Sequence, residues 1–283
     1  MKYVGILSFL LVVINACQVE QVADNVVSTE KESKTTTEEE TGMPLPAHVG
    51  KIFTENSKKY MYGGEDSTWN FDVTNGVLID SQYHYGIGRE AFHALIEPEF
   101  ISVLEADNEF TDSAGFLFLQ IGEVKRAYSI ELLIHHEIVN DVVNGEPVMA
   151  AYCILADLGA IYKRTYADKV FTFALSGYTY YDPKVWNGTD GFVFWDRETE
   201  STWWPLIGKG VSGPMLDVPL QEYNEENWRK MTWKEIKELH PDVMVLKPDQ
   251  SMEPPMEWEK YDSLTVEYIK AQLKGKLDSE GDF

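Results

Sequence analysis

Cysteine is nearly absent from this sequence of 283 residues, in which only Cys17 and Cys153 occur. A fold that depends on several disulfide bonds is therefore excluded. Cys17 is assigned another role below, which leaves Cys153 without a partner inside the chain. An unpaired cysteine in an exported protein is a buried and inert residue, a metal ligand or a reactive thiol.

Basic side chains are scarce as well. The chain has 24 lysines and arginines against 47 aspartates and glutamates, and its formal net charge is -23. Such an acidic surface repels nucleic acids and anionic lipids, so DNA binding and a polybasic contact with a membrane are both excluded. The charge is compatible with a well-solvated surface, with cationic partners and with divalent ions, and it does not choose among them.

A long hydrophobic run is missing outside the N-terminus. Lys2 precedes an apolar run at residues 4–14, which is too short to span a bilayer and has the layout of a signal peptide. The next residues, Asn-Ala-Cys, resemble the lipobox of bacterial lipoproteins. This implies a signal peptide at residues 1–16 and lipidation of Cys17 with acyl chains such as palmitate. We therefore expect a membrane anchor in the bacterial cell envelope, outside the cytoplasm.

Residues 17–44 form an acidic segment rich in Ser, Thr and Glu. It has too few apolar and aromatic side chains to bury a core, which predicts a disordered tether between the lipid and the folded domain.

From residue 52 onward, apolar residues and turn signals predict mostly strands. Strands are expected at residues 69–73 and 77–79 around an Asn-Gly turn, and at 116–121, 124–128, 148–152, 159–164, 170–175, 191–195 and 202–207. Helices are expected at 130–139, at 232–239 with a capping box of Thr232 and Glu235, and at 264–273. The fold class is α+β: one β-dominated domain with a few short helices at residues 45–260, followed by a C-terminal helix and acidic tail at 261–283.

Seven short motifs follow one another in a specific order over about residues 86–246. They stand at residues 126–128 (RAY), 136–141 (HEIVND), 145–148 (GEPV), 152–153 (YC), 173–177 (FALSG), 196–203 (DRETESTW) and 232–246 (TW, HPD and VL). In order and spacing they resemble the bacterial family known as domain of unknown function 3179. The resemblance implies an envelope domain and brings no established activity with it.

Three segments depart from the family pattern. The family's Cys-Pro-Leu, followed by a second Cys, Thr or Ser, is replaced by Cys-Ile-Leu-Ala at residues 153–156. Lys-Arg at 163–164 stands in place of Asp-Arg, and Trp-Pro at 204–205 stands in place of Ser-Gln. A paired-cysteine site is excluded, and the chain is interpreted as a divergent member that has lost part of a site.

The first candidate site involves His136. A zinc-protease pattern is excluded because Asn140, and not a second histidine, stands four residues after His136. On the predicted helix His136 faces the core, where it is typical of a buried, hydrogen-bonded residue with Asn140 at the helix end. Cys153 closes an apolar strand and is typical of a small core residue. Alternatively, His136 and Cys153 meet, with Asn140 and Asp141 orienting them, and bind a transition metal or supply a thiolate nucleophile. Further possible ligands are Met149, Met215, His84 and His93.

The second candidate site lies in the aromatic stretch of residues 178–204. The rings either form a platform for a sugar or peptide or fill the core of a strand-rich domain, and the second interpretation is favoured. The candidate binding residues are Trp203, Trp204, Asp196 and Arg197. Asp196 and Arg197 are more typical of a structural ion pair than of a catalytic pair.

Two functions remain open. The first is a non-enzymatic envelope protein that binds a small ligand, a sugar or an envelope partner through the aromatic stretch. The second is a metal- or thiol-dependent envelope enzyme that uses His136 and Cys153, with copper, zinc or iron as the metal. The lack of a second cysteine favours the first.

Overall fold

The computed structural model describes residues 48–250 and 258–280. The predicted signal peptide of residues 1–16, the predicted lipidation at Cys17 and the predicted tether of residues 17–44 lie outside the described residues. Within the described part of the chain, no helix is both long enough and apolar enough to cross a membrane.

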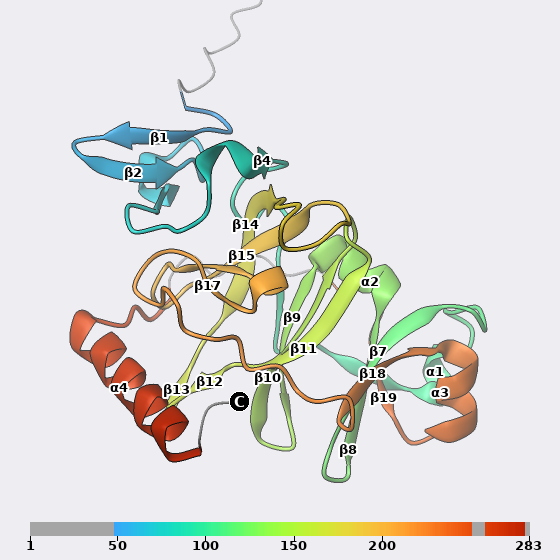
Figure 1. Ribbon diagram of the computed structural model, residues 1–283. Helices are drawn as coiled ribbons and strands as arrows, with labels where there is room; N and C mark the ends of the chain where they lie inside the picture. The colour runs from blue at the N-terminus through green and yellow to red at the C-terminus, as the bar shows by residue number, and fades with distance from the viewer. Residues whose placement is uncertain (1–47, 251–257, 281–283) are drawn as a thin grey trace, which may run out of the picture. The chain divides into compact units, whose positions relative to one another are not determined.

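Strands dominate the described residues, with a few short helices among them (Figure 1). The strands are β1 (Ile52–Glu55), β2 (Lys58–Met61), β3 (Phe71–Asp72), β4 (Tyr83–Tyr85), β5 (Leu95–Ile96), β6 (Phe100–Ser102), β7 (Gly115–Ile121), β8 (Val124–Ser129), β9 (Ile138–Val143), β10 (Glu146–Cys153), β11 (Leu158–Lys163), β12 (Thr165–Tyr166), β13 (Lys169–Val170), β14 (Phe173–Tyr180), β15 (Gly191–Asp196), β16 (Thr202–Trp204), β17 (Lys209–Gly210), β18 (Trp228–Thr232) and β19 (Met244–Leu246). The helices are α1 (Val103–Ala106), α2 (Ile130–His136), α3 (Trp233–Leu239) and α4 (Ser263–Glu280), with 3-10 turns η1 (Ser67–Trp69), η2 (Asp80–Gln82) and η3 (Pro205–Ile207). The predicted β-dominated α+β class is confirmed.

Three larger sheets make up most of the fold. A four-stranded sheet has the order β11-β10-β9-β5, and two five-stranded sheets have the orders β17-β16-β15-β14-β4 and β18-β7-β8-β19-β6. Figure 1 shows β9, β10 and β11 between the sheet with β14 and β15 and the sheet with β7 and β18. Smaller sheets are formed by β1-β2-β3 and by β12-β13.

Strand β10 is buried on both of its faces. Successive side chains of a strand point to opposite sides. Met149, Ala151 and Cys153 accordingly pack toward β14, β15 and β16, whereas Val148 and Ala150 pack toward β7 and β8. Burial on both faces explains why residues 148–153 of β10 are apolar without alternation.

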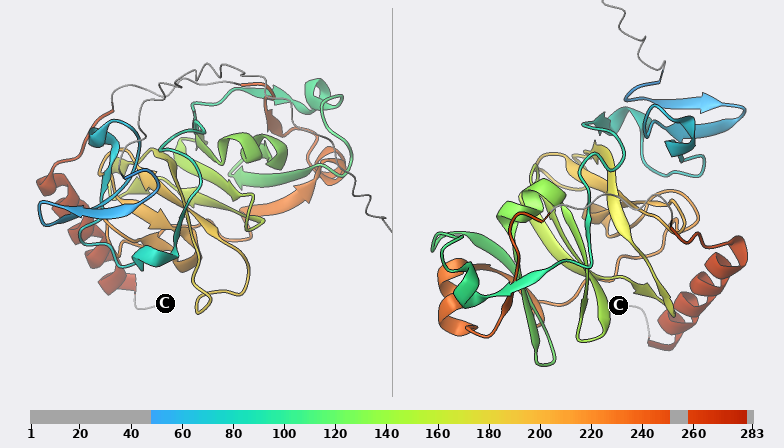
Figure 2. Two further views of the ribbon diagram at one scale, coloured as in Figure 1. Left: turned by 90° about the horizontal axis from the view of Figure 1, so that it is seen from above. Right: turned by 180° about the vertical axis from the view of Figure 1, so that it is seen from behind.

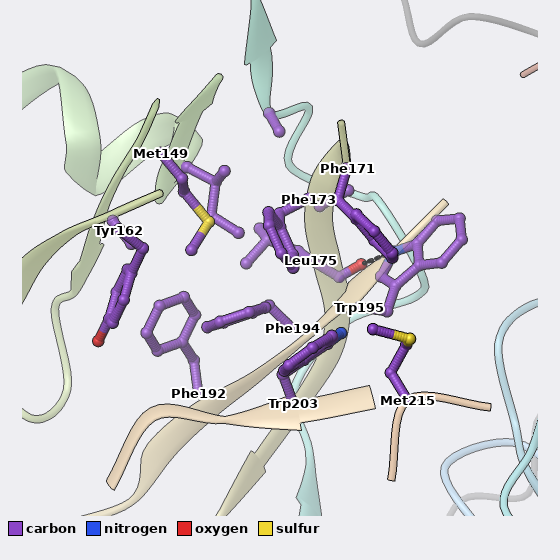
Figure 3. Packing of buried hydrophobic residues seen from close by; sticks show 14 of the residues in the cluster. Met149, Tyr162, Phe171, Phe173, Leu175, Phe192, Phe194, Trp195, Trp203 and Met215 are labelled. Atoms are coloured by element: carbon purple, nitrogen blue, oxygen red, sulfur yellow. Dashed lines mark hydrogen bonds between the residues drawn. The ribbon is translucent and has the colours of Figure 1, made fainter. Parts of the chain in front are cut away.

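The largest core cluster lies between the four-stranded sheet and the sheet of β14, β15 and β16. Figure 3 shows Phe173, Phe194 and Trp203 facing Met149 and Tyr162. The ring centroid of Phe173 is 5.4 Å from that of Phe194 and 5.7 Å from that of Trp203, in edge-on geometry. Aromatic side chains therefore fill this interior, where each buries a large apolar area.

Several strands predicted from the sequence are confirmed, and they pair with their neighbours along the chain. β7 pairs with β8, β10 with β11, and β15 with β16, all antiparallel. The capping box is also present at α3, because the Thr232 side chain accepts from the Glu235 backbone and the Glu235 carboxylate accepts from the Thr232 backbone. In each case neighbouring residues form the interaction, so the sequence pattern is sufficient to predict it.

The hairpin predicted at Asn75-Gly76 is wrong. Residues 77–79 do not form a strand, and β3 pairs with β2 through Tyr60–Asp72 and Met61–Phe71. Asn75 instead binds the backbone of Gly213, donating to its carbonyl at 2.9 Å and accepting from its N–H at 2.8 Å. The Asn75 side chain, which was predicted to lie in a local turn, therefore binds a residue 138 positions away in the chain.

The helix predicted at residues 130–139 is too long. α2 ends at His136, Glu137 follows with a left-handed φ of +53°, and β9 begins at Ile138. The β-branched residues of β9 pair with β10 and are buried between two sheets, which outweighs their helical spacing. Asn140 is therefore a strand residue, and the predicted helix face shared by His136 and Asn140 does not exist.

The C-terminal helix packs on the largest core cluster through Val266 and Ile269. Just before it, the Tyr261 hydroxyl donates to the Val170 carbonyl at 2.6 Å, and the Tyr261 N–H donates to the Glu198 carbonyl at 2.8 Å. Figures 1 and 2 accordingly show α4 beside the β12–β13 hairpin.

Candidate functional site

The two tryptophans predicted for ligand binding are part of the core. Trp203 and Trp204 are 0% and 1% exposed. Trp203 Nε1 donates a hydrogen bond of 2.7 Å to the Asp196 carboxylate. Because both indole rings are covered by protein, they do not form the predicted platform for a sugar or peptide.

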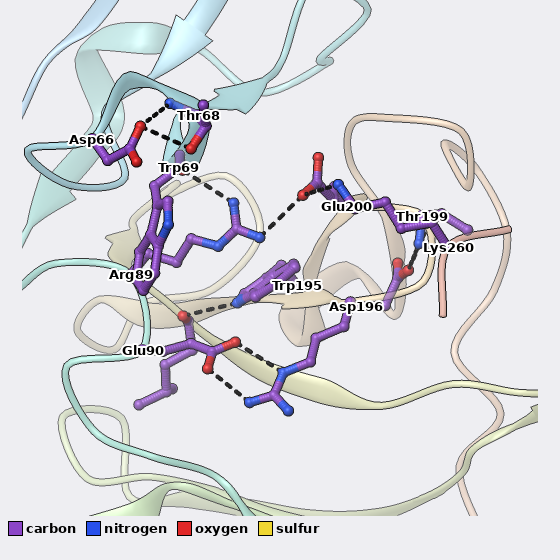
Figure 4. A network of polar contacts seen from close by, with 12 residues as sticks. Asp66, Thr68, Trp69, Arg89, Glu90, Trp195, Asp196, Thr199, Glu200 and Lys260 are labelled. Carbon is purple, nitrogen blue, oxygen red and sulfur yellow. Dashed lines mark hydrogen bonds and ion pairs between the residues drawn. The ribbon is translucent and has the colours of Figure 1, made fainter. Parts of the chain in front are cut away.

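The ion pair predicted between Asp196 and Arg197 does not form, because the Asp196 carboxylate is directed toward Thr199, as Figure 4 shows, and Arg197 binds a different carboxylate. Arg197 binds both carboxylate oxygens of Glu90, at 2.7 and 3.0 Å, and both side chains are buried. Asp196 accepts from the backbone N–H and the hydroxyl of Thr199, each at 2.7 Å. Burial raises the pKa of Asp196 to about 7. These contacts stabilise the turn between β15 and β16.

His136 and Asn140 have partners in different elements. His136 Nδ1 lies 2.8 Å from the carbonyl oxygen of His93. The Asn140 side chain accepts from the Phe173 N–H and donates to the Phe173 carbonyl, both at 2.9 Å. Asn140 therefore joins β9 to β14, and its role is to connect two sheets.

Asp141 points away from Asn140, toward the opposite face of β9. Its carboxylate accepts from the Tyr128 hydroxyl at 2.9 Å, and burial raises its pKa above the usual range. Among the described residues, the side chains of Asp141 and Asn140 form no hydrogen bond with His136 or Cys153. The predicted orienting role of this pair is therefore not supported by their positions.

His136 and Cys153 are not accompanied by the further ligands that the predicted transition metal would need. In residues 48–250 and 258–280, no group of three or more His, Cys, Asp or Glu side chains is arranged to hold a metal ion. Of the other predicted ligands, Met149 and Met215 are fully buried in the aromatic core.

Cys153 instead lies between two cavities. It ends β10, is 2% exposed, and lines both a cavity of about 220 Å³ and a cavity of about 190 Å³. We call the first the Glu137 cavity and the second the Glu222 cavity, after the carboxylate that lines each. Phe192 of β15 is the other side chain that lines both.

The Glu137 cavity is mainly apolar and has one carboxyl group in its wall. Residues that line it include Phe92, Glu137, Cys153, Leu155, Thr179 and Phe192. The backbone holds Glu137 in place, since its N–H donates to the Leu133 carbonyl at 2.6 Å and its carbonyl accepts from the Tyr152 N–H at 2.9 Å. Among the described residues, its carboxylate has no hydrogen-bond or ion-pair partner. Burial alone raises the pKa of Glu137 to about 7.

The thiol of Cys153 is poorly suited to nucleophilic chemistry in this state. Burial raises its pKa, and the nearby Glu137 carboxylate raises it further. The Sγ atom is 4.0 Å from the carbonyl oxygen of Asp190, the distance of a weak S–H donor. A thiol with a raised pKa stays protonated at neutral pH, and the thiolate is the reactive form.

Gly177 permits the backbone to close over the Glu137 cavity. It lies at an irregularity of β14 with φ +84°, and a Cβ atom there would be 2.0 Å from the carbonyl oxygen of Ile87. Its carbonyl accepts from the N–H groups of Gly86 and Ile87, at 3.0 and 3.2 Å. The glycine of the FALSG motif is therefore required by a close approach of two segments that both line the cavity.

A histidine–aspartate pair lies next to the Glu137 cavity. His84 Nδ1 is 2.5 Å from Asp190 Oδ2, which also accepts from the Thr179 hydroxyl at 3.0 Å. Thr179 lines the cavity, and the backbone of Asp190 contacts Cys153. His84, a possible ligand in the sequence, thus lies near Cys153 through the pairing of β4 with β14.

Sequence reasoning identified Cys153 and missed both carboxylates. One feature of the sequence could have pointed to Glu137 as a site residue, since it is a single charge between the apolar residues of α2 and those of β9. No such feature pointed to Glu222, because its position depends on a bridge to Tyr162, which is sixty residues earlier in the chain.

Comparisons with known proteins identify a family for the chain, and that family has no described activity. A family model described as "Protein of unknown function (DUF3179)" matches residues 89–271, a span that includes Glu137, Cys153 and Glu222. No curated protein and no solved structure matches the chain.

Proposed function

We propose, given that the chain belongs to the family described as "Protein of unknown function (DUF3179)", that it is a ligand-binding protein of the bacterial cell envelope. Its Glu137 cavity receives a small ligand with an apolar body and a basic group. The observation that carries this proposal is the unpartnered Glu137 carboxylate in the wall of an apolar cavity.

An unpaired carboxylate in such a place is unfavourable for the protein alone. Partial removal from water raises the free energy of the charged form, and a cationic ligand group at hydrogen-bond distance lowers it again. The net charge of -23 adds a long-range attraction for cations.

The rim of the cavity suits the apolar part of the ligand. Phe92, Ile154 and Leu155 line the cavity and are 41%, 45% and 59% exposed. Apolar side chains left exposed around a cavity are typical of ligand sites. A hydrocarbon chain that leaves the cavity would cover them.

The other function that the sequence left open, an enzyme based on His136 and Cys153, has less support. His136 binds a backbone carbonyl in another segment, and the pKa of the Cys153 thiol is raised. Binding therefore explains the geometry better than thiol or metal chemistry does.

Calorimetric titration with octylamine tests the proposal. We expect saturable binding to the protein, and affinity about tenfold lower for Glu137→Gln, because a charge-assisted hydrogen bond is lost. Octanoate, of similar length and opposite charge, should not bind. Affinity for octylamine should also fall as the pH is lowered through about 7, where Glu137 becomes protonated.

Glu123→Gln is the matched control, because Glu123 is an exposed residue in the β7–β8 turn. It removes the same charge and should leave the affinity unchanged. The proposal would be refuted by an octylamine affinity that is equal in the parent protein and in Glu137→Gln.

The envelope location is proposed from Lys2, the apolar run at residues 4–14 and Cys17. Metabolic labelling with a palmitate analogue in a bacterial host tests it. Label should be lost in Cys17→Ser and retained in Cys153→Ser, which removes the chain's other cysteine. Equal labelling of both variants would exclude Cys17 as the anchor.

A further inference from the structure

A second carboxylate lies at the neighbouring cavity. Gln221 and Tyr223 exchange backbone hydrogen bonds with β11, at 2.7 and 2.9 Å, so that Glu222 is paired with Tyr162. Paired residues of antiparallel segments project from the same face. Tyr162 belongs to the core between the sheets, and Glu222 is thereby directed to the same side, where it lines the Glu222 cavity.

Glu222 resembles Glu137 in lacking a partner. Among the described residues, its carboxylate forms no hydrogen bond and no ion pair. Burial by the cavity wall raises its pKa, and the nearby Glu225 raises it further. Glu222 is an exposed residue that lines its cavity, whereas Glu137 is half-buried.

The two cavities share two of their lining side chains. Cys153 and Phe192 line both of them. Small residues such as Ala151, Ala160 and Gly191 form much of the Glu222 cavity wall. Figure 3 shows the Phe192 ring on the side of the core that faces Tyr162.

The sizes of the cavities favour a shared ligand. Ligand sites usually measure about 300–1,000 Å³. The two cavities measure about 220 and 190 Å³, so that each alone holds only a small ligand and the two together are within the usual range.

We propose that the two cavities form one elongated site for a linear diamine, with one ammonium group at Glu137 and the other at Glu222. The methylene chain passes Cys153 and Phe192. This inference rests on the proposed function, because it assumes that Glu137 binds a basic group, and it adds the substrate class.

The distribution of charge along the site selects this class. Two unpartnered carboxylates lie at separate positions, and the wall between them is apolar. A monoamine would leave Glu222 unpaired, and a dicarboxylate would be repelled at both positions. A dication with a hydrocarbon middle satisfies both ends and the apolar wall.

The test compares 1,8-diaminooctane with octylamine by calorimetric titration of the full-length protein. The parent should bind the diamine about threefold more tightly than the monoamine, a modest factor because Glu222 is exposed to solvent. Glu222→Gln should remove this advantage and leave the octylamine affinity unchanged. Glu137→Gln should weaken both ligands.

Glu225→Gln is the matched control, since Glu225 is exposed three residues away and does not line the Glu222 cavity. It should preserve the preference for the diamine. Equal affinities for both amines, with octylamine still dependent on Glu137, would overturn the diamine inference and leave the proposed function standing. Failure of both amines to bind would refute the proposed function and the inference with it.

Discussion

Replacing Glu137 with glutamine is expected to raise the free energy of unfolding at pH 8 and to change it little at pH 4. The pKa of Glu137 is about 7 in the folded protein, and its ordinary value of 4.5 applies to the unfolded chain. Between these values the folded state binds more protons than the unfolded state, so the stability of the parent falls as the pH rises. Because glutamine does not titrate, the free energy of unfolding of the variant does not fall in this way as the pH rises.

The size of the effect follows from the same difference. One pKa unit corresponds to about 1.4 kcal/mol, which sets an upper limit of about 3 kcal/mol above pH 7. Because solvent reaches part of the Glu137 side chain, we expect a gain of about 1–2 kcal/mol. The gain should be near zero below pH 4.5 and should develop between pH 4.5 and 7.

Urea denaturation followed by tryptophan fluorescence at pH 4, 6 and 8 measures this gain. Asp196, whose pKa is also about 7, contributes equally to parent and variant, so the difference between them isolates Glu137. Glu123→Gln should show no gain at any pH. A Glu137→Gln variant no more stable than the parent at pH 8, or equally stabilised at pH 4 and pH 8, would refute the reasoning.

Three further substitutions test the architecture around the site. Asn140→Ala should lower the free energy of unfolding by about 2 kcal/mol in denaturation experiments, because it leaves buried backbone groups of β14 without partners. Glu90→Gln should lower the melting temperature and destabilise the protein by about 3 kcal/mol, since Arg197 loses its charge partner in a buried site; an unchanged melting temperature would argue against the pair. Thr232→Ala should destabilise by about 1 kcal/mol and speed amide exchange in the first turn of α3, whereas Thr232→Ser should retain the cap.

Local interactions account for what was predictable in the fold. β7 and β8 are joined by a two-residue turn at Gly122, and the cap of α3 involves residues three positions apart. Such patterns depend on neighbours in the chain, so the sequence contains all the participants.

The predictions that were wrong concern segments whose state depends on distant partners. Asn75 is bound by Gly213, and the end of α2 is determined by the pairing of β9 with β10. The early end of α2 also changes which residue lies at the candidate site. Because the chain reverses into a strand after His136, the residue near Cys153 is Glu137, and His136 binds another segment.

The sequence by itself determined the acidic charge, the signal-like N-terminus with Cys17, the β-dominated class and the family motifs. Only the tertiary structure decided that Trp203 is inside and that Glu137 and Glu222 each line a cavity beside Cys153. The physical reason is that composition and local pattern act over a few residues, whereas burial depends on which sheets pack together. Glu137 is a candidate binding group because the surrounding chain has partly removed it from water and left it unpaired.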